Sequence, residues 1–204
     1  ATKSQHSQWI TGDGARQYGH LLRATNDAVL VGSGTVLEDD PDLTCRLPGL
    51  SNDRRPRIVI DGRLRVPLTS KLVRSANQVP LWLVTLASHS ADQTSQYEAH
   101  GVTVIRVKAD KAGHPGIPEW SLELGRRGLT RILVEGGSAM AGGLLSANLI
   151  DRIAWFRAPK LMGDDGIAAI PALGVDRIED LPKFQTKLSK LLGQDRLDIL
   201  ERTR

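Results

Sequence analysis

The chain has 204 residues, of which 40% are hydrophobic and 25% are charged, a composition that favours a folded globular protein and excludes a fully disordered one. Its single cysteine, Cys45, excludes an intramolecular disulfide and a cysteine-based zinc site within the chain, which is typical of a reducing compartment. No apolar run reaches the roughly 18 residues that a membrane helix needs, so we expect a cytoplasmic protein with no membrane partner.

The net charge of +4 raises the question of an anionic partner. The basic residues are scattered between acidic ones, and four Trp, two Tyr and two Phe provide little aromatic surface for stacking bases. An anionic small molecule accounts for this charge at least as well as a nucleic acid does. We therefore expect no nucleic-acid partner, and a non-catalytic nucleotide- or RNA-binding module is the weakest alternative.

The first regular element is a helix predicted over residues 14–24, with an apolar face and Asp13 as its cap. Arg16 and Arg23 are seven residues apart, so they fall near the same face of this helix. On composition alone they are solvated helix charges. A buried strand is predicted over 28–31.

The segment after this strand can be compared with the glycine-rich fingerprint of dinucleotide-binding folds. It has the G-x-G pattern over 32–34, but Leu37 stands where the third glycine belongs, and no full crossover helix follows. A Rossmann fold is therefore not indicated. Asp39 and Asp40 precede Pro41, which favours a turn. Without further ligands nearby, we expect capping and turn roles for the two acids rather than a metal site.

The middle of the chain alternates apolar runs with polar stretches, which is typical of an α/β protein. Strands are predicted over 57–61, 81–85, 102–105 and 131–134. Between them we expect loops over 47–56 and 66–73, a short surface helix or loop over 88–96, and a helix over 119–127.

The stretch 131–145 has the pattern that we expect the fold to be organised around. An apolar strand ends at Glu135, a double glycine follows, and Ser138 is placed to cap a helix over 138–148. Free backbone N–H groups and the positive end of a helix dipole bind phosphate at such a turn. The alternative is a tight turn whose glycines serve its geometry alone.

The C-terminal part continues with a strand predicted over 152–156 and a loop over 158–166. Two further strands, over 183–188 and 196–202, are expected to pair as an antiparallel ribbon at one sheet edge. No internal repeat or linker is evident, so we predict one α/β domain over residues 1–204.

Several separated motifs now resemble one family, the reductase domain of the bifunctional riboflavin-biosynthesis deaminase/reductase. They occur in one order: Ser7-Gln8-Trp9-Ile10-Thr11, Leu22-Arg23, Gly34-Thr35-Val36-Leu37-Glu38-Asp39-Asp40-Pro41, Leu43-Thr44, Arg46, Glu135-Gly136-Gly137, Gly142-Gly143-Leu144-Leu145 and Ala158-Pro159-Lys160-Leu161-Met162-Gly163. The resemblance covers nearly the whole chain. It implies a dihydrofolate-reductase-like fold: a mixed, mostly parallel sheet with flanking helices and a C-terminal antiparallel ribbon.

The resemblance also implies an activity, the NADPH-dependent reduction of 5-amino-6-(5-phosphoribosylamino)uracil, in a homodimer. The matching positions for this phosphorylated ribosylaminopyrimidine substrate are Ser7, Arg23, Leu43, Arg46 and Glu135. Those for the cofactor are Trp9, Thr35, Asp39, Gly62, Gly137, Ser138, Ala139, Met140, Ala141, Gly142 and Gly143. Glu135 is the candidate catalytic residue, with substrate positioning without proton transfer as the alternative. No metal is expected.

The chain departs from the family pattern at its start. In the family a strand precedes the Ser-Gln-Trp segment, and the zinc deaminase half carries H-x-E and P-C-x-x-C motifs that this sequence lacks. We therefore expect a reductase part that is fused to, or paired with, a separate deaminase. A related reductase that acts on another pterin or pyrimidine is the alternative function.

Overall fold

The structure is a computed structural model that describes residues 1–4, 9–50 and 54–203. The chain forms two compact units, one of residues Ala1–Gly19 with Ala141–Arg204 and the other of residues His20–Met140. The chain passes from one unit to the other within helix α1 (Asp13–Thr25) and within helix α6 (Ser138–Ser146). In the described ranges no helix is both long and apolar enough to cross a membrane.

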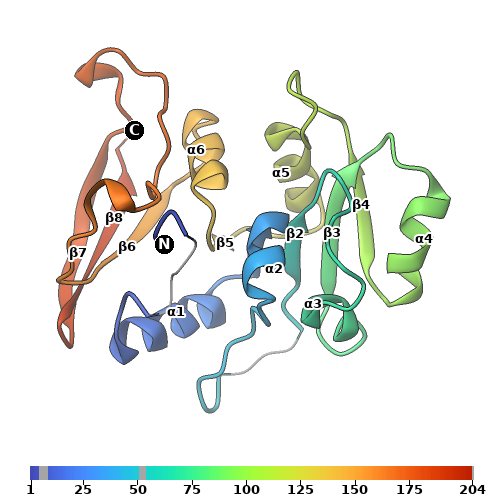
Figure 1. Cartoon of the computed structure of the whole chain (residues 1–204), viewed down its shortest axis with the longest axis horizontal. Coiled ribbons are helices and arrows are strands. Elements are labelled where there is room, and N and C mark those ends of the chain that lie inside the picture. Colours follow the sequence, from blue (N-terminus) through green and yellow to red (C-terminus); the bar gives the residue numbers. More distant parts are fainter. Residues whose placement is uncertain (5–8, 51–53, 204) are drawn as a thin grey trace. The chain divides into compact units, whose positions relative to one another are not determined.

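The unit His20–Met140 contains a parallel sheet with strand order β4-β3-β2-β1-β5 in the described part of the chain (Figure 1). Its strands are β1 (Ala28–Gly32), β2 (Arg57–Ile60), β3 (Leu81–Leu86), β4 (Thr103–Val107) and β5 (Ile132–Val134). Leu30 of β1 is in register with Ile58 of β2 and Val134 of β5. Because the strands are parallel, their carboxyl ends lie along one edge of the sheet.

Helices α2 (Ser33–Asp39), α3 (Lys71–Arg74), α4 (Ala91–Ala99) and α5 (Ile117–Arg126) flank this sheet (Figure 1). Local sequence signals start them. The Ser90 side chain accepts from the Gln93 N–H, and the Gln93 side chain accepts from the Ser90 N–H, so a capping box begins α4. Pro118 in the first turn of α5 has the backbone φ that a helix start favours.

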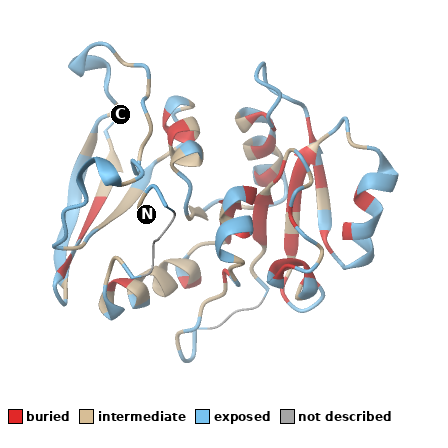
Figure 2. Cartoon of the chain, in the orientation of Figure 1, coloured by how far each residue is buried: buried red, intermediate tan, exposed pale blue. Residues whose placement is uncertain are grey.

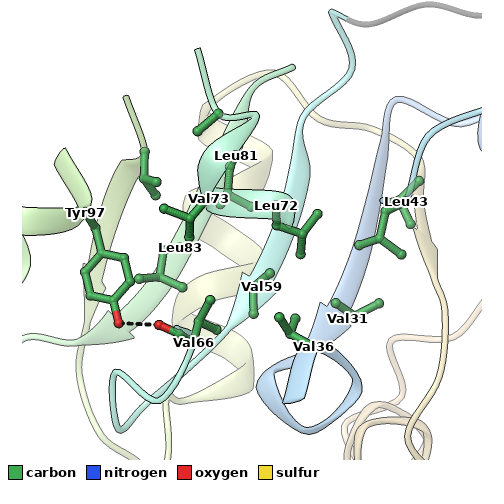
Figure 3. Close-up of a cluster of buried hydrophobic side chains, with 13 residues drawn as sticks. Val31, Val36, Leu43, Val59, Val66, Leu72, Val73, Leu81, Leu83 and Tyr97 are labelled. Atoms are coloured by element: carbon green, nitrogen blue, oxygen red, sulfur yellow. Dashed lines mark hydrogen bonds between the residues drawn. The ribbon is translucent and has the colours of Figure 1, made fainter. Parts of the chain in front are cut away.

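The core of this unit is a cluster of branched aliphatic side chains from the sheet and the helices around it (Figure 3). Val31, Val59 and Leu83 are fully shielded from solvent, and Tyr97 closes one end of the cluster. The Tyr97 hydroxyl donates to the Val66 carbonyl at 2.7 Å, so its polar atom is satisfied while its ring is buried. This core packs β1 and β2 against the surrounding helices.

The other unit contains an antiparallel sheet of order β6-β8-β7, built from β6 (Arg152–Arg157), β7 (Phe184–Leu192) and β8 (Asp195–Arg202). Gly193, at a φ of +67°, makes the tight turn that joins β7 to β8. Most of β7 is exposed, whereas β8 is buried along its first half (Figure 2). Two short 3₁₀ turns, Gly163–Asp165 and Ile178–Asp180, also belong to this unit.

The predicted α/β class, with its parallel sheet, flanking helices and antiparallel ribbon, is confirmed. The ribbon itself differs from the prediction, because it pairs with β6 in a sheet of its own. The segment expected as loop and turn over 66–73 ends in a short helix, α3, and the segment after β1 forms the seven-residue helix α2, where no full crossover helix was expected. Asp13 lies in the first turn of α1 instead of at its cap, because the Gly12 carbonyl already accepts from the Arg16 N–H. The single-domain assignment stays a prediction.

Candidate active site

The carboxyl edge of the parallel sheet gathers most of the predicted site residues of the unit His20–Met140. Glu135 follows β5, and its N–H donates to the Leu30 carbonyl at 2.9 Å, so its backbone extends the pairing of β5 with β1. Thr35 lies in α2, directly after β1. Ligands bind at this edge of open parallel sheets, which agrees with the position expected for Glu135.

The double-glycine turn after Glu135 has a backbone that other residues adopt only with strain. Gly136 and Gly137 have φ angles of +91° and +67°. A Cβ atom on Gly136 would lie 3.0 Å from the Thr35 Oγ1 atom, so the turn passes close to the start of α2. The side chain of Met140 reaches toward Gly32, and a Cβ there would lie 3.9 Å from the Met140 Cε atom. The double-glycine turn thus lies close to Thr35, and Met140 lies close to the end of β1, while the cofactor role of these residues stays a prediction.

Ser138 was predicted to cap helix α6, but the helix already begins at this residue. Ser138 is thus in the first helical turn, and Gly137 precedes the helix. The backbone N–H groups of this first turn have no partners within the helix, and they carry the positive end of its dipole. Such groups can bind a phosphate, and the phosphate-binding role of this turn stays a prediction.

Glu135 forms a bidentate ion pair with Arg23 of α1. The Arg23 Nε and Nη2 atoms donate to the two carboxylate oxygens of Glu135 at 2.7 and 2.6 Å, and its Nη1 atom donates to the Thr44 carbonyl at 3.0 Å. The two side chains are only 19% and 27% exposed. Burial opposes the charge of Arg23, but its hydrogen bonds to Glu135 and the charge of Glu135 raise the pKa of Arg23 above its ordinary value.

This pair corrects the description of Arg23 as a solvated helix charge. Its partner is 112 residues away in the sequence, so composition and helical spacing could not reveal it. The family resemblance placed Arg23 and Glu135 in one substrate site, and the structure does bring them together.

The segment Asp40–Arg46 lies beside this ion pair and has an unusual backbone. Asp40 and Leu43 have φ angles of +38° and +56°, which non-glycine residues rarely adopt. Three side chains hold the segment: Arg23 binds the Thr44 carbonyl, the buried Arg57 donates to the Asp42 carbonyl at 3.3 Å, and the Asp40 carboxylate accepts from the Lys71 N–H at 2.9 Å.

Two predicted substrate residues belong to this segment and differ in exposure. Leu43 is 4% exposed and packs in the core cluster, so only its backbone is available to a ligand. Arg46 is exposed, and its backbone N–H donates to the His20 Nδ1 atom at 3.3 Å. Burial, together with the charges of Arg23 and Arg46, lowers the pKa of His20 below its ordinary value, despite opposing effects of the Thr44 carbonyl and Glu135.

Gly62 lies at the same sheet edge, after β2. A Cβ atom there would lie 2.6 Å from the Pro115 Cδ atom, so the close approach of a rigid proline ring requires glycine. The Gly62 carbonyl is 2.9 Å from the His89 Nε2 atom, which fixes the turn to the segment after β3. Asp39, a further predicted cofactor residue, is exposed at the last position of α2.

The other predicted residues belong to the unit of Ala1–Gly19 with Ala141–Arg204, or lie outside the described residues. Trp9 is 64% exposed, and the Arg16 guanidinium lies over its ring, 4.5 Å from the centroid. One face of the indole is therefore covered by a cation. Ala141, Gly142 and Gly143 continue α6, and a Cβ atom on Gly142 would collide with Pro171. Ser7 lies outside the described residues.

Sequence reasoning missed three side chains that shape these turns: His20, Arg57 and His89. His20 is three residues before Arg23 on one helix, so helical neighbourhood could have drawn attention to it. Nothing in the local sequence marks the other two. Within the described ranges, no group of three or more His, Cys, Asp or Glu side chains is arranged to hold a metal ion.

Comparison with known proteins gives these features a family context. The riboflavin biosynthesis protein RibD of Escherichia coli is 34% identical over an alignment of 208 positions, gaps included. The alignment covers 96% of this chain and 54% of that protein. The chain thus spans about half the length of such relatives.

Two solved structures share the fold over the full length of the chain. Acinetobacter baumannii RibD superposes with a TM-score of 0.80 at 25% identity, with 54% of that chain covered. A diaminohydroxyphosphoribosylaminopyrimidine deaminase/5-amino-6-(5-phosphoribosylamino)uracil reductase from Thermotoga maritima superposes with a TM-score of 0.74 at 25% identity, with 52% covered. The resemblance inferred from the motifs is therefore confirmed. Because the model of the RibD C-terminal domain also matches residues 1–197, the chain belongs to the RibD C-terminal domain family.

Proposed function

We propose that this chain is an oxidoreductase that reduces 5-amino-6-(5-phosphoribosylamino)uracil with NADPH, converting the ribosyl group into a ribityl group. The observation that carries the proposal is the Arg23–Glu135 pair at the carboxyl edge of the sheet, directly beside the double-glycine turn. In this proposal the Glu135 carboxylate anchors the substrate, and the turn that binds the cofactor phosphates follows it directly in the chain. The activity named for the Thermotoga maritima relative supports the same reaction.

The double-glycine turn fits a dinucleotide, because two glycines without side chains precede the first turn of α6, whose N–H groups can bind phosphate oxygens. Gly137, Ser138, Ala139 and Met140 would hold the pyrophosphate through these groups, and the Thr35 hydroxyl lies close enough to Gly136 to help. NADPH supplies the hydride when bound, so the protein has to position the sugar carbon and exclude water.

Glu135 has the role of a positioning acceptor in this proposal. Both of its oxygens accept hydrogen bonds from Arg23, and each carboxylate oxygen has a second lone pair for a further donor. A ribose hydroxyl or the linking amine of the substrate is such a donor. The contacts favour positioning over proton donation, because Arg23 binds the carboxylate form on both oxygens.

Arg46 supplies the charge that a phosphorylated sugar requires. Arg23 has its guanidinium nitrogens engaged by Glu135 and Thr44, whereas the Arg46 side chain, which follows Thr44 in the same segment, is exposed. A guanidinium can bind two phosphate oxygens at once. This cationic position favours an anionic, phosphorylated substrate over an uncharged pterin. Cytoplasmic location, a homodimer and association with a zinc deaminase remain part of the proposal.

The test is NADPH oxidation by the purified chain with the phosphoribosylaminouracil as substrate. Arg46→Ala should raise the KM for this substrate by about tenfold or more, because one charge-assisted contact contributes about 1.5–3 kcal/mol, while the affinity for NADPH stays the same. Dihydrofolate serves as the comparison substrate and should not be turned over. An equal loss of affinity for substrate and NADPH in the variant would contradict the role given to Arg46.

A further inference from the structure

His20 has no part in the site as proposed so far, yet it touches the segment that carries Arg46. It lies on α1, one turn before Arg23, and its ring is partly buried. Its Nδ1 atom accepts the Arg46 backbone N–H at 3.3 Å across a sequence separation of 26 residues. The contact therefore ties the Arg46 backbone to the same helix that carries the Arg23–Glu135 pair.

The contact requires a neutral imidazole, because a ring nitrogen that bears a proton cannot accept a hydrogen bond. The charged groups that face the ring are Arg23, Arg46 and Glu135. Burial of the ring, followed by the charges of Arg23 and Arg46, outweighs the Thr44 carbonyl and Glu135, which favour a protonated ring, so the pKa of His20 is lowered. This electrostatic setting and the hydrogen-bond geometry agree with each other.

Arg23, Arg57 and His20 hold Thr44, Asp42 and Arg46 at successive points of one irregular segment. The first two contacts are to carbonyls upstream of Arg46. His20 makes the contact at Arg46 itself, so it has the most direct effect on where this residue's side chain begins.

We propose that His20 is a positioning residue for the phosphate of the substrate, because its Nδ1 atom fixes the backbone of Arg46 where that side chain meets the phosphate. The inference rests on the proposed function, in which Arg46 binds the phosphorylated sugar. It adds a residue that is proposed to touch neither substrate nor cofactor and to act through the backbone of Arg46.

Two substitutions separate this role from a general structural one. His20→Leu fills a similar volume but removes the acceptor. His20→Asn keeps an uncharged acceptor near the position of Nδ1, since the side-chain amide oxygen is the same number of bonds from the backbone. His100→Leu is the matched control, because His100 also contacts a backbone group through Nδ1, the Gln96 carbonyl, at the end of α4.

The first measurement is hydrogen exchange at the Arg46 amide, which requires no turnover. Loss of one ordinary hydrogen bond corresponds to roughly a two- to tenfold change in an equilibrium, so exchange should accelerate by about that factor in His20→Leu. His20→Asn should restore the slower rate, and the His100 control should match the wild type. Equal exchange at Arg46 in the wild type and His20→Leu would overturn the inference.

The second measurement is the affinity for ribose 5-phosphate as a probe of the phosphate position, followed by calorimetry. His20→Leu should weaken it about two- to tenfold, His20→Asn should recover it, and the Kd for NADPH should be unchanged in both. Equal affinities in the wild type and His20→Leu, or an equal loss for NADPH, would overturn the inference. Absence of NADPH oxidation by a chain that passes both tests would instead count against the proposed reaction alone.

Discussion

The Arg23–Glu135 pair gives the sharpest test of how the site is built. We consider Arg23→Gln, Glu135→Gln and the double variant, which form a cycle around the two hydrogen bonds of 2.7 and 2.6 Å. Fully exposed ion pairs contribute about 0.2–1 kcal/mol, and breaking a buried pair costs about 3–5 kcal/mol. With side chains 19% and 27% exposed, this pair lies between the two cases.

We therefore expect each single variant to lower the free energy of unfolding by about 2–3 kcal/mol, between these two limits. The double variant should lose clearly less free energy of unfolding than the two single variants lose together, because the second substitution removes a group whose partner is already gone. For a chain of this size the single variants should melt roughly 4–12 °C lower than the wild type.

Urea denaturation followed by circular dichroism measures all four proteins under one set of conditions. Arg177→Gln and Glu179→Gln serve as controls, because that pair is 75% and 69% exposed and should contribute less than about 1 kcal/mol. Two results would show that the pair does not organise the site. The Arg23 and Glu135 variants could lose no more free energy of unfolding than these controls, or the losses of the two single variants could simply add in the double variant.

Three further predictions follow from the turns and from His20. Gly136→Ala places a Cβ at a φ of +91° and 3.0 Å from the Thr35 Oγ1 atom, so unfolding should become easier by about 1–2 kcal/mol and NADPH affinity should fall; unchanged melting would argue against a rigid turn. Gly62→Ala should also lower the melting temperature, because its Cβ would lie 2.6 Å from the Pro115 Cδ atom; a melting temperature as high as that of the wild type is the contrary result. The lowered pKa of His20 means that the unfolded chain binds its proton first as pH falls below 6.5, so stability should decline from there toward the lower folded pKa; His20→Asn should remove this decline, and a persisting slope would exclude His20 as its source.

The strands of the parallel sheet could be predicted from sequence because each is a short run of branched apolar residues bounded by turn residues. The position of Glu135 followed from the same pattern, since a residue that ends such a strand lies at the ligand-binding edge. The helix over Ser33–Asp39 was harder to predict, because its seven residues are too few for an apolar period and include a glycine.

Other features depend on contacts that sequence patterns do not contain. Arg57 reads as the charged first residue of a strand, yet it is 2% exposed and its guanidinium donates to backbone carbonyls from separate segments. The pairing of β6 with β8 likewise joins residues that are distant in the sequence, from Arg152 with Glu201 to Arg157 with Arg196. Such partners are fixed by tertiary packing, so only the family resemblance could place Arg23 and Glu135 in one site.

The central claim is that this chain reduces a phosphoribosylaminopyrimidine with NADPH. The most direct measurement is the loss of NADPH absorbance when the purified chain is mixed with 5-amino-6-(5-phosphoribosylamino)uracil. Roughly one NADPH should be oxidised per substrate molecule, and mass spectrometry identifies the product. We predict a product heavier by two hydrogen atoms, formed at a rate that Glu135→Gln strongly reduces. NADPH that binds but is not oxidised with this substrate, or turnover that is unaffected by Glu135→Gln, would contradict the account.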